Sequence, residues 1–147
     1  MKSFRIGHHD SEFLDVRIVR RSHHSRDYWD ANWVEAEVEV KVGGFRGTFS
    51  AEFRTEELRD FRDELTRLYS FDTKEAKFKT LEDQLSIDIE GDSTGHFSAT
   101  CVAEDKAGMG NRLRFLLYFD QTEIPEALNG LNEVVREFPV IGSPNGR

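Results

Sequence analysis

The segment from Trp33 to Arg54 constrains the fold more than any other, because it has the pattern of a β-hairpin. Apolar residues occupy nearly every second position on each side of Gly43-Gly44, and most positions between them are charged or polar. Successive side chains of a strand point to opposite faces, so a two-residue turn at the glycines places the apolar residues on one face. This register predicts three apolar cross-strand pairs: Val42 with Phe45, Val38 with Phe49, and Val34 with Phe53.

Alternating apolar residues outside this hairpin predict further strands, separated by polar or glycine-containing segments. Two strands are expected before the hairpin, around Phe4 and Leu14, and the polar residues 20–30 are expected to form an exposed loop. Four strands are expected after it, at 76–78, 85–89, 97–101 and 113–119. Both faces of the 113–119 strand are partly apolar, so we expect this strand to lie in the centre of the sheet.

Two segments have the three- and four-residue apolar spacing of amphipathic helices. The first is expected to begin with Thr55 as its N-cap and to end near Ser70. The second is expected to begin around Thr122, with Pro125 in its first turn, and to end at Pro139. The predicted buried stripes are Leu58, Phe61, Leu65 and Leu68 in the first helix, and Ile124, Leu128, Leu131, Val135 and Phe138 in the second.

These elements predict an α+β fold: an antiparallel β-meander sheet of about seven to eight strands with two amphipathic helices packed on one face. The chain of 147 residues has the size of one domain, and it contains no internal sequence repeat. We expect residues 1–141 to form this single domain and residues 142–147, rich in Gly, Pro, Ser and Asn, to form a flexible C-terminal tail.

Charge and apolar content limit the kinds of partner. The formal net charge is −8, and binding to a nucleic acid backbone needs clustered Lys and Arg, so a nucleic acid partner is not expected. Residues 1–31 hold six Lys/Arg against five Asp/Glu, a net of +1, so residues 32–147 hold −9. Such a negative field speeds association with a basic protein. No stretch is apolar and long enough to span a membrane, the N-terminal residues do not resemble a secretion signal, and there is one cysteine, so a cytoplasmic location is expected.

Residues that could carry chemistry do not occur at the spacings that catalysis or metal binding requires. His8-His9 and His23-His24 are adjacent pairs, and adjacent residues of a strand point to opposite faces, so neither pair is expected to hold a metal ion. Cys101 shares a strand face with apolar neighbours and is expected to be buried rather than nucleophilic. Asp88 and Glu90 share a strand face, and a solvated sheet surface explains them without a cation. We therefore expect no enzymatic activity, no cofactor and no metal.

The outward face of the hairpin is the first candidate for binding. Glu35, Glu37 and Glu39 alternate along its first strand, and the register places Glu52 opposite Glu35. Like charges directly opposite each other are unfavourable, so this arrangement is consistent with a face kept for a basic partner. The alternative is a face that only confers solubility. Its counter-charges would be Lys41, Arg46 and Arg54.

The aromatic residues Tyr28, Trp29 and Trp33, at the entrance to the hairpin, are the second candidate. The register puts the Trp33 ring opposite Arg54, and exposed aromatic residues beside arginine are enriched at protein interfaces. The alternative is that Tyr28 and Trp29 fold back and cap the open end of the core.

Short motifs distributed over roughly residues 32–140 form a recognisable set. They are Asn32-Trp33, Val42-Gly43-Gly44-Phe45, Gly47, Leu58, Phe61, Leu65, Leu68-Tyr69, Thr80-Leu81-Glu82, Gly91-Asp92, Gly95-His96, Gly110-Asn111, Asp120-Gln121-Thr122 and Phe138-Pro139. This set resembles the WapI-like family of small bacterial immunity proteins. The Gly-Gly-Phe hairpin turn and the Asp-Gln-Thr helix entry are its most specific parts. The basic, histidine-bearing segment 19–31 lies outside the resemblance.

The resemblance implies a cytoplasmic antidote that binds a nuclease-type toxin and blocks it without turning over a substrate. Together with the two candidate surfaces, it supports the leading hypothesis of an immunity protein that neutralises a basic toxin by occlusion. The rival hypothesis is a small-ligand-binding or enzymatic domain with a pocket between sheet and helices, and with His96 or Asp120 at its rim. A third is a subunit that forms a homodimer through a sheet edge.

Overall fold

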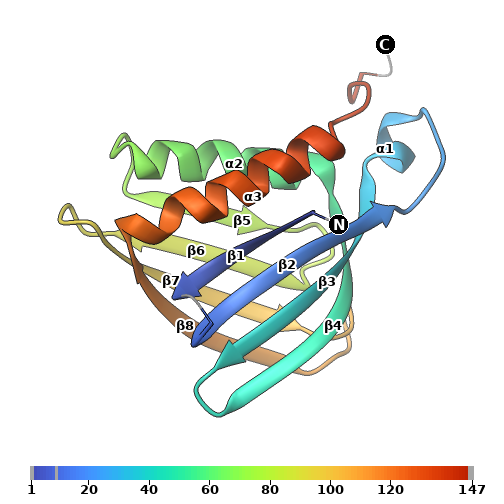
Figure 1. Cartoon of the computed structure of the whole chain (residues 1–147). Coiled ribbons are helices and arrows are strands. Elements are labelled where there is room, and N and C mark those ends of the chain that lie inside the picture. Colours follow the sequence, from blue (N-terminus) through green and yellow to red (C-terminus); the bar gives the residue numbers. More distant parts are fainter. Residues whose placement is uncertain (1, 9, 146–147) are drawn as a thin grey trace.

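Four strands and a helix, followed by four more strands and a second helix, make up the fold (Figure 1). The structure is a computed structural model that describes residues 2–8 and 10–145. The first half contains β1 (Lys2–His8), β2 (Glu12–Arg21), the one-turn helix α1 (Tyr28–Ala31), β3 (Trp33–Val42), β4 (Phe45–Arg54) and α2 (Thr55–Tyr69). The second half contains β5 (Glu75–Lys79), β6 (Leu85–Gly91), β7 (His96–Glu104), β8 (Arg112–Asp120), the short 3₁₀ helix η1 (Gln121–Glu123) and α3 (Ile124–Glu137).

The strands form two antiparallel sheets with the orders β1-β2-β3-β4 and β5-β6-β7-β8. The predicted α+β class and the antiparallel meander with two covering helices are confirmed, and the described residues contain eight strands. The meander is divided in two because α2 separates β4 from β5. The two halves therefore share one arrangement although the sequence has no repeat.

The prediction that the 113–119 strand is central is wrong, because β8 is the last strand of the second sheet. Its inner residues Phe115 and Leu117 are buried, whereas Leu116 is 40% and Tyr118 64% exposed on the outer face. The apolar residues on both faces, which suggested a central strand, therefore include an apolar patch that faces solvent.

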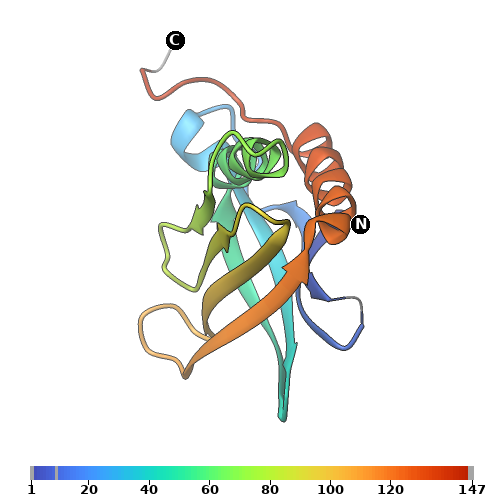
Figure 2. The ribbon, with the colours of Figure 1, turned by 90° about the vertical axis from the view of Figure 1, so that its left-hand side faces the viewer.

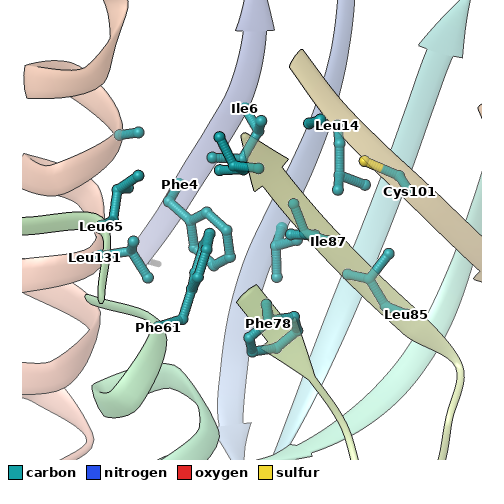
Figure 3. Close-up of a cluster of buried hydrophobic side chains, with 14 of the residues drawn as sticks. Phe4, Ile6, Leu14, Phe61, Leu65, Phe78, Leu85, Ile87, Cys101 and Leu131 are labelled. Atoms are coloured by element: carbon teal, nitrogen blue, oxygen red, sulfur yellow. The ribbon is translucent and has the colours of Figure 1, made fainter. Parts of the chain in front are cut away.

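The core lies between the two sheets and under the two helices. Phenylalanine rings connect the layers: Phe61 of α2 lies 5.9 Å from Phe4 of β1 and 5.4 Å from Phe78 of β5, and Phe78 lies 5.3 Å from Phe53 of β4. Figure 3 shows Leu65 and Leu131 of the helices directed toward the same cluster. Aromatic and aliphatic side chains thus fill the interior between the helices and the sheets.

The hairpin register is the one that the sequence predicts, with Val42 opposite Phe45, Val38 opposite Phe49 and Val34 opposite Phe53. The apolar side is not hidden along its whole length. Near the helices Val34 and Phe53 are fully buried, but Phe45 at the tip is 64% exposed and Phe49 is half-buried. The reason is visible in Figure 2, where the hairpin tip projects beyond the rest of the molecule at the end opposite the helices.

The start of α2 differs by one residue from the prediction. Arg54, not Thr55, is the N-cap of α2, and its backbone N–H donates to Glu57 Oε1 at 2.7 Å. At the start of η1, Asp120 accepts from the backbone N–H of Thr122, and Pro125 lies in the first turn of α3, as predicted. In the last turns of α3 the buried residue is Val134, whereas Val135 is only half-buried.

Candidate partner-binding surface

The predicted acidic row lies on the outer face of the first sheet. Glu35, Glu37 and Glu39 alternate along β3 with exposed or half-exposed carboxylates, and Glu52 of β4 is directly opposite Glu35. The like-charge pair predicted from the register is therefore present in the fold.

Arginines of the neighbouring strands pair with the three glutamates of β3. Arg17 of β2 pairs with Glu37, Arg20 of β2 approaches Glu35 at 3.3 Å, and Arg46 of β4 approaches Glu39 at 3.1 Å. A bulge in β2 skips Val19 in the register and places Arg20 opposite Glu35.

Of the three counter-charges expected from the sequence, Lys41, Arg46 and Arg54, only Arg46 pairs with a glutamate of the acidic row. Lys41 donates instead to the backbone carbonyl of Asp10 at 3.2 Å, and Arg54 is turned away from the row. The pairing of Arg17 and Arg20 with these glutamates was not predicted from the sequence. Alternation along β2 places Arg17 on the outward face, but it does not place Arg20 there, because the bulge that shifts Arg20 to this face cannot be read from the pattern.

An open groove of about 690 Å³ runs along one end of the acidic row. Four glutamates line it, Glu35, Glu37 and Glu52 of the hairpin and Glu82 of the segment between β5 and β6, together with Arg20 and His23. Glu52 accepts a hydrogen bond from the neutral Ser22 hydroxyl at 2.6 Å. Among the residues that the structure describes, neither Glu52 nor Glu82 has a cationic partner. The groove therefore has unneutralised negative charge.

The aromatic residues gather at the end of the same row, around the side chain of Arg54, which is only 4% exposed. The centre of its guanidinium lies 5.3 Å from the Tyr28 ring and 5.1 Å from the rings of Trp29 and Trp33. Its remaining donors reach the backbone carbonyls of Trp29 at 2.8 Å and Tyr28 at 3.2 Å, and its Nε pairs with Glu56. We call Tyr28, Trp29, Trp33, Arg54 and Glu56 the aromatic–arginine cluster.

The contact predicted between Trp33 and Arg54 is present. For Tyr28 and Trp29 the two alternatives were an exposed binding surface and a cap on the core, and the structure shows part of each. Tyr28 is half-buried and its hydroxyl donates to Glu56, whereas Trp29 is 55% exposed with its ring edge-on to Tyr28. Burial lowers the pKa of the Arg54 guanidinium and raises the pKa of Glu56. The cluster thus holds an exposed tryptophan in a fixed position next to the acidic row.

A short helix within the predicted loop positions these rings. Asp27 caps α1 by accepting from the backbone N–H groups of Trp29 at 3.2 Å and Asp30 at 3.3 Å. The expectation of a loop over 20–30 is therefore wrong at both ends, because Arg20 and Arg21 belong to β2 and residues 28–30 to α1.

Asn32, which the sequence pattern did not indicate as functional, holds α1, the start of α2 and the segment after α3 together. Its fully buried side chain donates to the carbonyls of Tyr28 and Ile141 and accepts from the Thr55 hydroxyl and the Ile141 N–H, each at 2.8 Å. Arg21 adds a bond to the carbonyl of Pro139 at 2.5 Å. The chain after α3 is thereby held against α1 up to Ile141. The prediction of a flexible tail over 142–147 stays a prediction, and residues 146–147 lie outside the described part.

The described histidines of the two adjacent pairs lie at the surface, and Cys101 is buried, as the sequence predicts for the cysteine. His8 lies 2.9 Å from Glu123, His23 and His24 are exposed, and His9 is outside the described residues. The described residues contain no group of three side chains suited to a metal ion. Cys101 is fully buried, and this burial raises the pKa of its thiol to about 12.

The residues of the rival hypothesis, His96 and Asp120, lie directly opposite each other on β7 and β8, at the surface rather than in an enclosed pocket. His96 is exposed, lies 3.0 Å from the Thr94 hydroxyl, and lines a surface hollow of about 290 Å³ on the outer side of the second sheet. The hydroxyl of Thr122 and then its backbone N–H donate to the Asp120 carboxylate, and these bonds lower the pKa of Asp120. Asp120 therefore acts as a helix cap.

Comparisons with known proteins identify both the fold and the family. No curated protein gives a significant match to the sequence. Among solved structures, the crystal structures of Trypanosoma bruciei MRP1/MRP2 align with 93% of this chain and 86% of that chain at 9% identity and a TM-score of 0.51. A guideRNA-binding protein complex bound to a gRNA aligns with 92% of this chain and 91% of that chain, at 9% identity and a TM-score of 0.49. At 9% identity the first likeness concerns the fold alone.

None of the helices in the described part of the chain has both the length and the apolar character of a membrane-spanning segment. The model of the immunity protein WapI-like family matches residues 5–139. This match extends the resemblance seen in the motifs at 32–140, and it includes the segment 19–31 that the motifs had left out. It spans both sheets, both long helices and the aromatic–arginine cluster, so the chain belongs to the immunity protein WapI-like family.

Proposed function

We propose that this protein is a non-catalytic immunity protein that binds a basic, nuclease-like toxin and occludes its active site. Membership of the WapI-like family supports an immunity role. The observation that supports a basic partner is the groove beside β3 and β4, where Glu52 and Glu82 have no cationic partner among the described residues. Such a protein would act in the cytoplasm, where Cys101 stays reduced.

The charge of the groove suits the active site of a nuclease. A nuclease must present positive charge to hold phosphates, and a negative surface is attracted by the same field. The ion pairs of Glu35, Glu37 and Glu39 are partly solvent-exposed, and exposed pairs are worth only about 0–1 kcal/mol each. These glutamates can therefore exchange Arg17, Arg20 and Arg46 for cations of the toxin at little cost.

The aromatic–arginine cluster supplies an apolar anchor at the end of the charged row. Trp29 exposes 55% of its surface, while Arg54 and Tyr28 hold its ring in place. An aromatic side chain that is already ordered loses little conformational entropy on binding, and such residues are frequent hot spots. The proposed contact residues are Glu35, Glu37, Glu39, Glu52, Tyr28, Trp29 and Trp33.

The test measures association with the purified product of the adjacent gene, as the candidate toxin, over a range of NaCl concentrations. In the double variant Glu52→Gln/Glu82→Gln we expect the association rate at low salt to fall several-fold and its salt dependence to flatten. Reversal of charge at Glu37 and Glu39 should have the same effect. The matched control is Glu90→Gln/Glu137→Gln, two exposed carboxylates away from this face. Equal association rates for the wild type and the groove variants would remove this face from the proposal.

Trp29→Ala tests the anchor separately. The substitution removes an exposed ring, so stability should change little, while dissociation from the toxin should become at least tenfold faster. An unchanged dissociation rate would exclude Trp29 as an anchor.

A further inference from the structure

Within the described residues the two sheets leave four edge strands, β1, β4, β5 and β8, and three of them are covered. α3 packs closely against β1 at Gly130, where a Cβ would lie 2.3 Å from the carbonyl oxygen of Ser3. The backbone N–H of Lys77 in β5 donates to Glu64 of α2 at 2.9 Å. β8 lies beside β1. The edge of β4 has no such cover near the hairpin tip, where residues 45–48 are exposed.

The register identifies the backbone groups that this edge presents. In a two-residue hairpin the pair next to the turn, Val42 and Phe45, is hydrogen-bonded, and bonded and non-bonded pairs then alternate. The odd-numbered residues of β4 therefore bond to β3, and the even-numbered residues direct their N–H and C=O outward. In agreement, the carbonyl of Ser50 accepts from the Gln84 side chain at 3.2 Å. Gln84 covers the edge at Ser50, so the open groups are those of Arg46 and Thr48.

The inner face of this open edge is apolar. Phe45 is 64% exposed, Phe49 is half-buried, and a Cβ on Gly47 between them would meet no atom within 4 Å. A groove of about 290 Å³, lined also by Asp105, Asn111 and Arg112, separates these residues from Ala103 and Leu113 of the second sheet. Natural edge strands are commonly protected by charges or proline, and here the one charge, Arg46, pairs with Glu39 on the outer face.

We propose that a second copy of this chain pairs with the edge of β4, in an antiparallel two-fold arrangement centred on Gly47. Arg46 of each copy then lies opposite Thr48 of the other, and each of these pairs exchanges two backbone hydrogen bonds. The two Gly47 residues face each other at the axis, and Phe45 of each copy lies opposite Phe49 of the other. Because Gly47 has no side chain, it leaves room for these aromatic pairs, which lie against the grooves of the two copies.

The charges of the outer face favour a second copy over an unrelated strand. Lys41 is opposite Arg46 in the register, while Thr48 is opposite Glu39, which is in turn opposite Asp15. The two-fold pairing aligns Arg46 of one copy with Thr48 of the other, so the joined face runs from Lys41 and Arg46 of one copy, through Thr48, to Glu39 and Asp15 of the other. The residue directly opposite each Arg46 is thus neutral, and the pairing places no like charges directly opposite each other.

Cysteine cross-linking tests the register. Gly47→Cys places two thiols on a non-hydrogen-bonded pair, whose Cα atoms are about 4.5 Å apart, within the range of a disulfide. Under mild oxidation this variant should form a covalent dimer of twice 17.0 kDa. The matched control is Gly44→Cys, which also has open space around the added Cβ but lies opposite Ser50 of the other copy in this register. Equal cross-linking of the two variants would overturn the proposed register, and absence of cross-linking in the Gly47→Cys variant would overturn the proposal.

Sedimentation of the unmodified chain tests the association itself. The wild type should sediment as a dimer that dissociates on dilution. Thr48→Pro removes an outward N–H without removing a bond to β3, and Phe45→Ser shortens an exposed side chain, so each should raise the dissociation constant at least tenfold. If Thr48→Pro impairs folding, the Phe45→Ser variant decides. A wild type that is monomeric at all concentrations, or a dimer that survives Phe45→Ser unchanged, would refute the proposal.

Discussion

Replacement of Asn32 by alanine should destabilise the protein more than its single side chain suggests. Asn32 makes four hydrogen bonds, each of 2.8 Å, and is fully buried. The N–H and the carbonyl of Ile141, a half-buried residue, can bond to water when this segment detaches. The Tyr28 carbonyl keeps its hydrogen bond from Arg54. The Thr55 hydroxyl, 1% exposed, is left without a partner. At about 1 kcal/mol for each of the other three bonds and about 1–3 kcal/mol for the orphaned hydroxyl, we expect a loss of about 4–6 kcal/mol.

Urea unfolding followed by circular dichroism measures this loss as the change in the free energy of unfolding. The matched control is Asn111→Ala, because Asn111 is exposed and bonds only within its loop; its change should stay within about 0.5 kcal/mol. Adding Thr55→Val removes the orphaned hydroxyl, so the double variant should be no less stable than Asn32→Ala alone. If Asn32→Ala and Asn111→Ala have the same effect, the reasoning on Asn32 is refuted.

Three further predictions concern the core, acid stability and the thiol. Phe61→Ala removes a fully buried ring that contacts Phe4 and Phe78, so urea unfolding should report a loss of about 3–5 kcal/mol; a loss below about 1 kcal/mol would contradict the packing. Hydrogen bonds from Thr94 and the backbone of His96 lower the pKa of Asp92 from 3.8 to about 2. The ionised form therefore stabilises the fold above the ordinary value, and this stabilisation is lost as the pH falls toward 2. Asp92→Asn should remove that part of the pH dependence between pH 4 and 2, and an unchanged profile would contradict it. Burial raises the pKa of Cys101 to about 12, so a thiol reagent at pH 8 should label it only after unfolding; rapid labelling of the native protein would contradict its burial.

The Asn32 and Arg54 contacts connect stability with the proposed binding surface. Asn32 holds α1 against the start of α2, and α1 carries Tyr28 and Trp29 onto Arg54. Loss of Asn32 should therefore loosen the aromatic anchor as well as destabilise the fold. The open edge of β4 around Gly47 lies at the other end of the hairpin from the aromatic anchor, but Glu39 is opposite Thr48 and belongs to both proposed surfaces. The groove variant Glu52→Gln/Glu82→Gln and Trp29→Ala therefore test toxin binding apart from self-association.

Local patterns in the sequence determined the strands, the hairpin register and the two long helices. The register of β3 and β4 depends on a two-residue turn and on alternation within 22 consecutive residues, so neighbouring positions carry the whole signal. The same holds for the outward direction of Glu35, Glu37 and Glu39. The predicted helices needed only the spacing of apolar residues, and their errors were confined to one residue at a cap and one at a buried turn.

Only the tertiary structure decided which charges remain available on the candidate surface. A bulge in β2 brought Arg20 to Glu35, and packing of α1 turned Arg54 away from the acidic row. The bonds between Asn32 and Ile141 join residues 109 positions apart, and no local pattern encodes such a contact. The exposed tip of the hairpin likewise depends on where the second sheet ends. Alternation sets the face on which a side chain lies, whereas its burial and its partners depend on what the rest of the chain brings to that face.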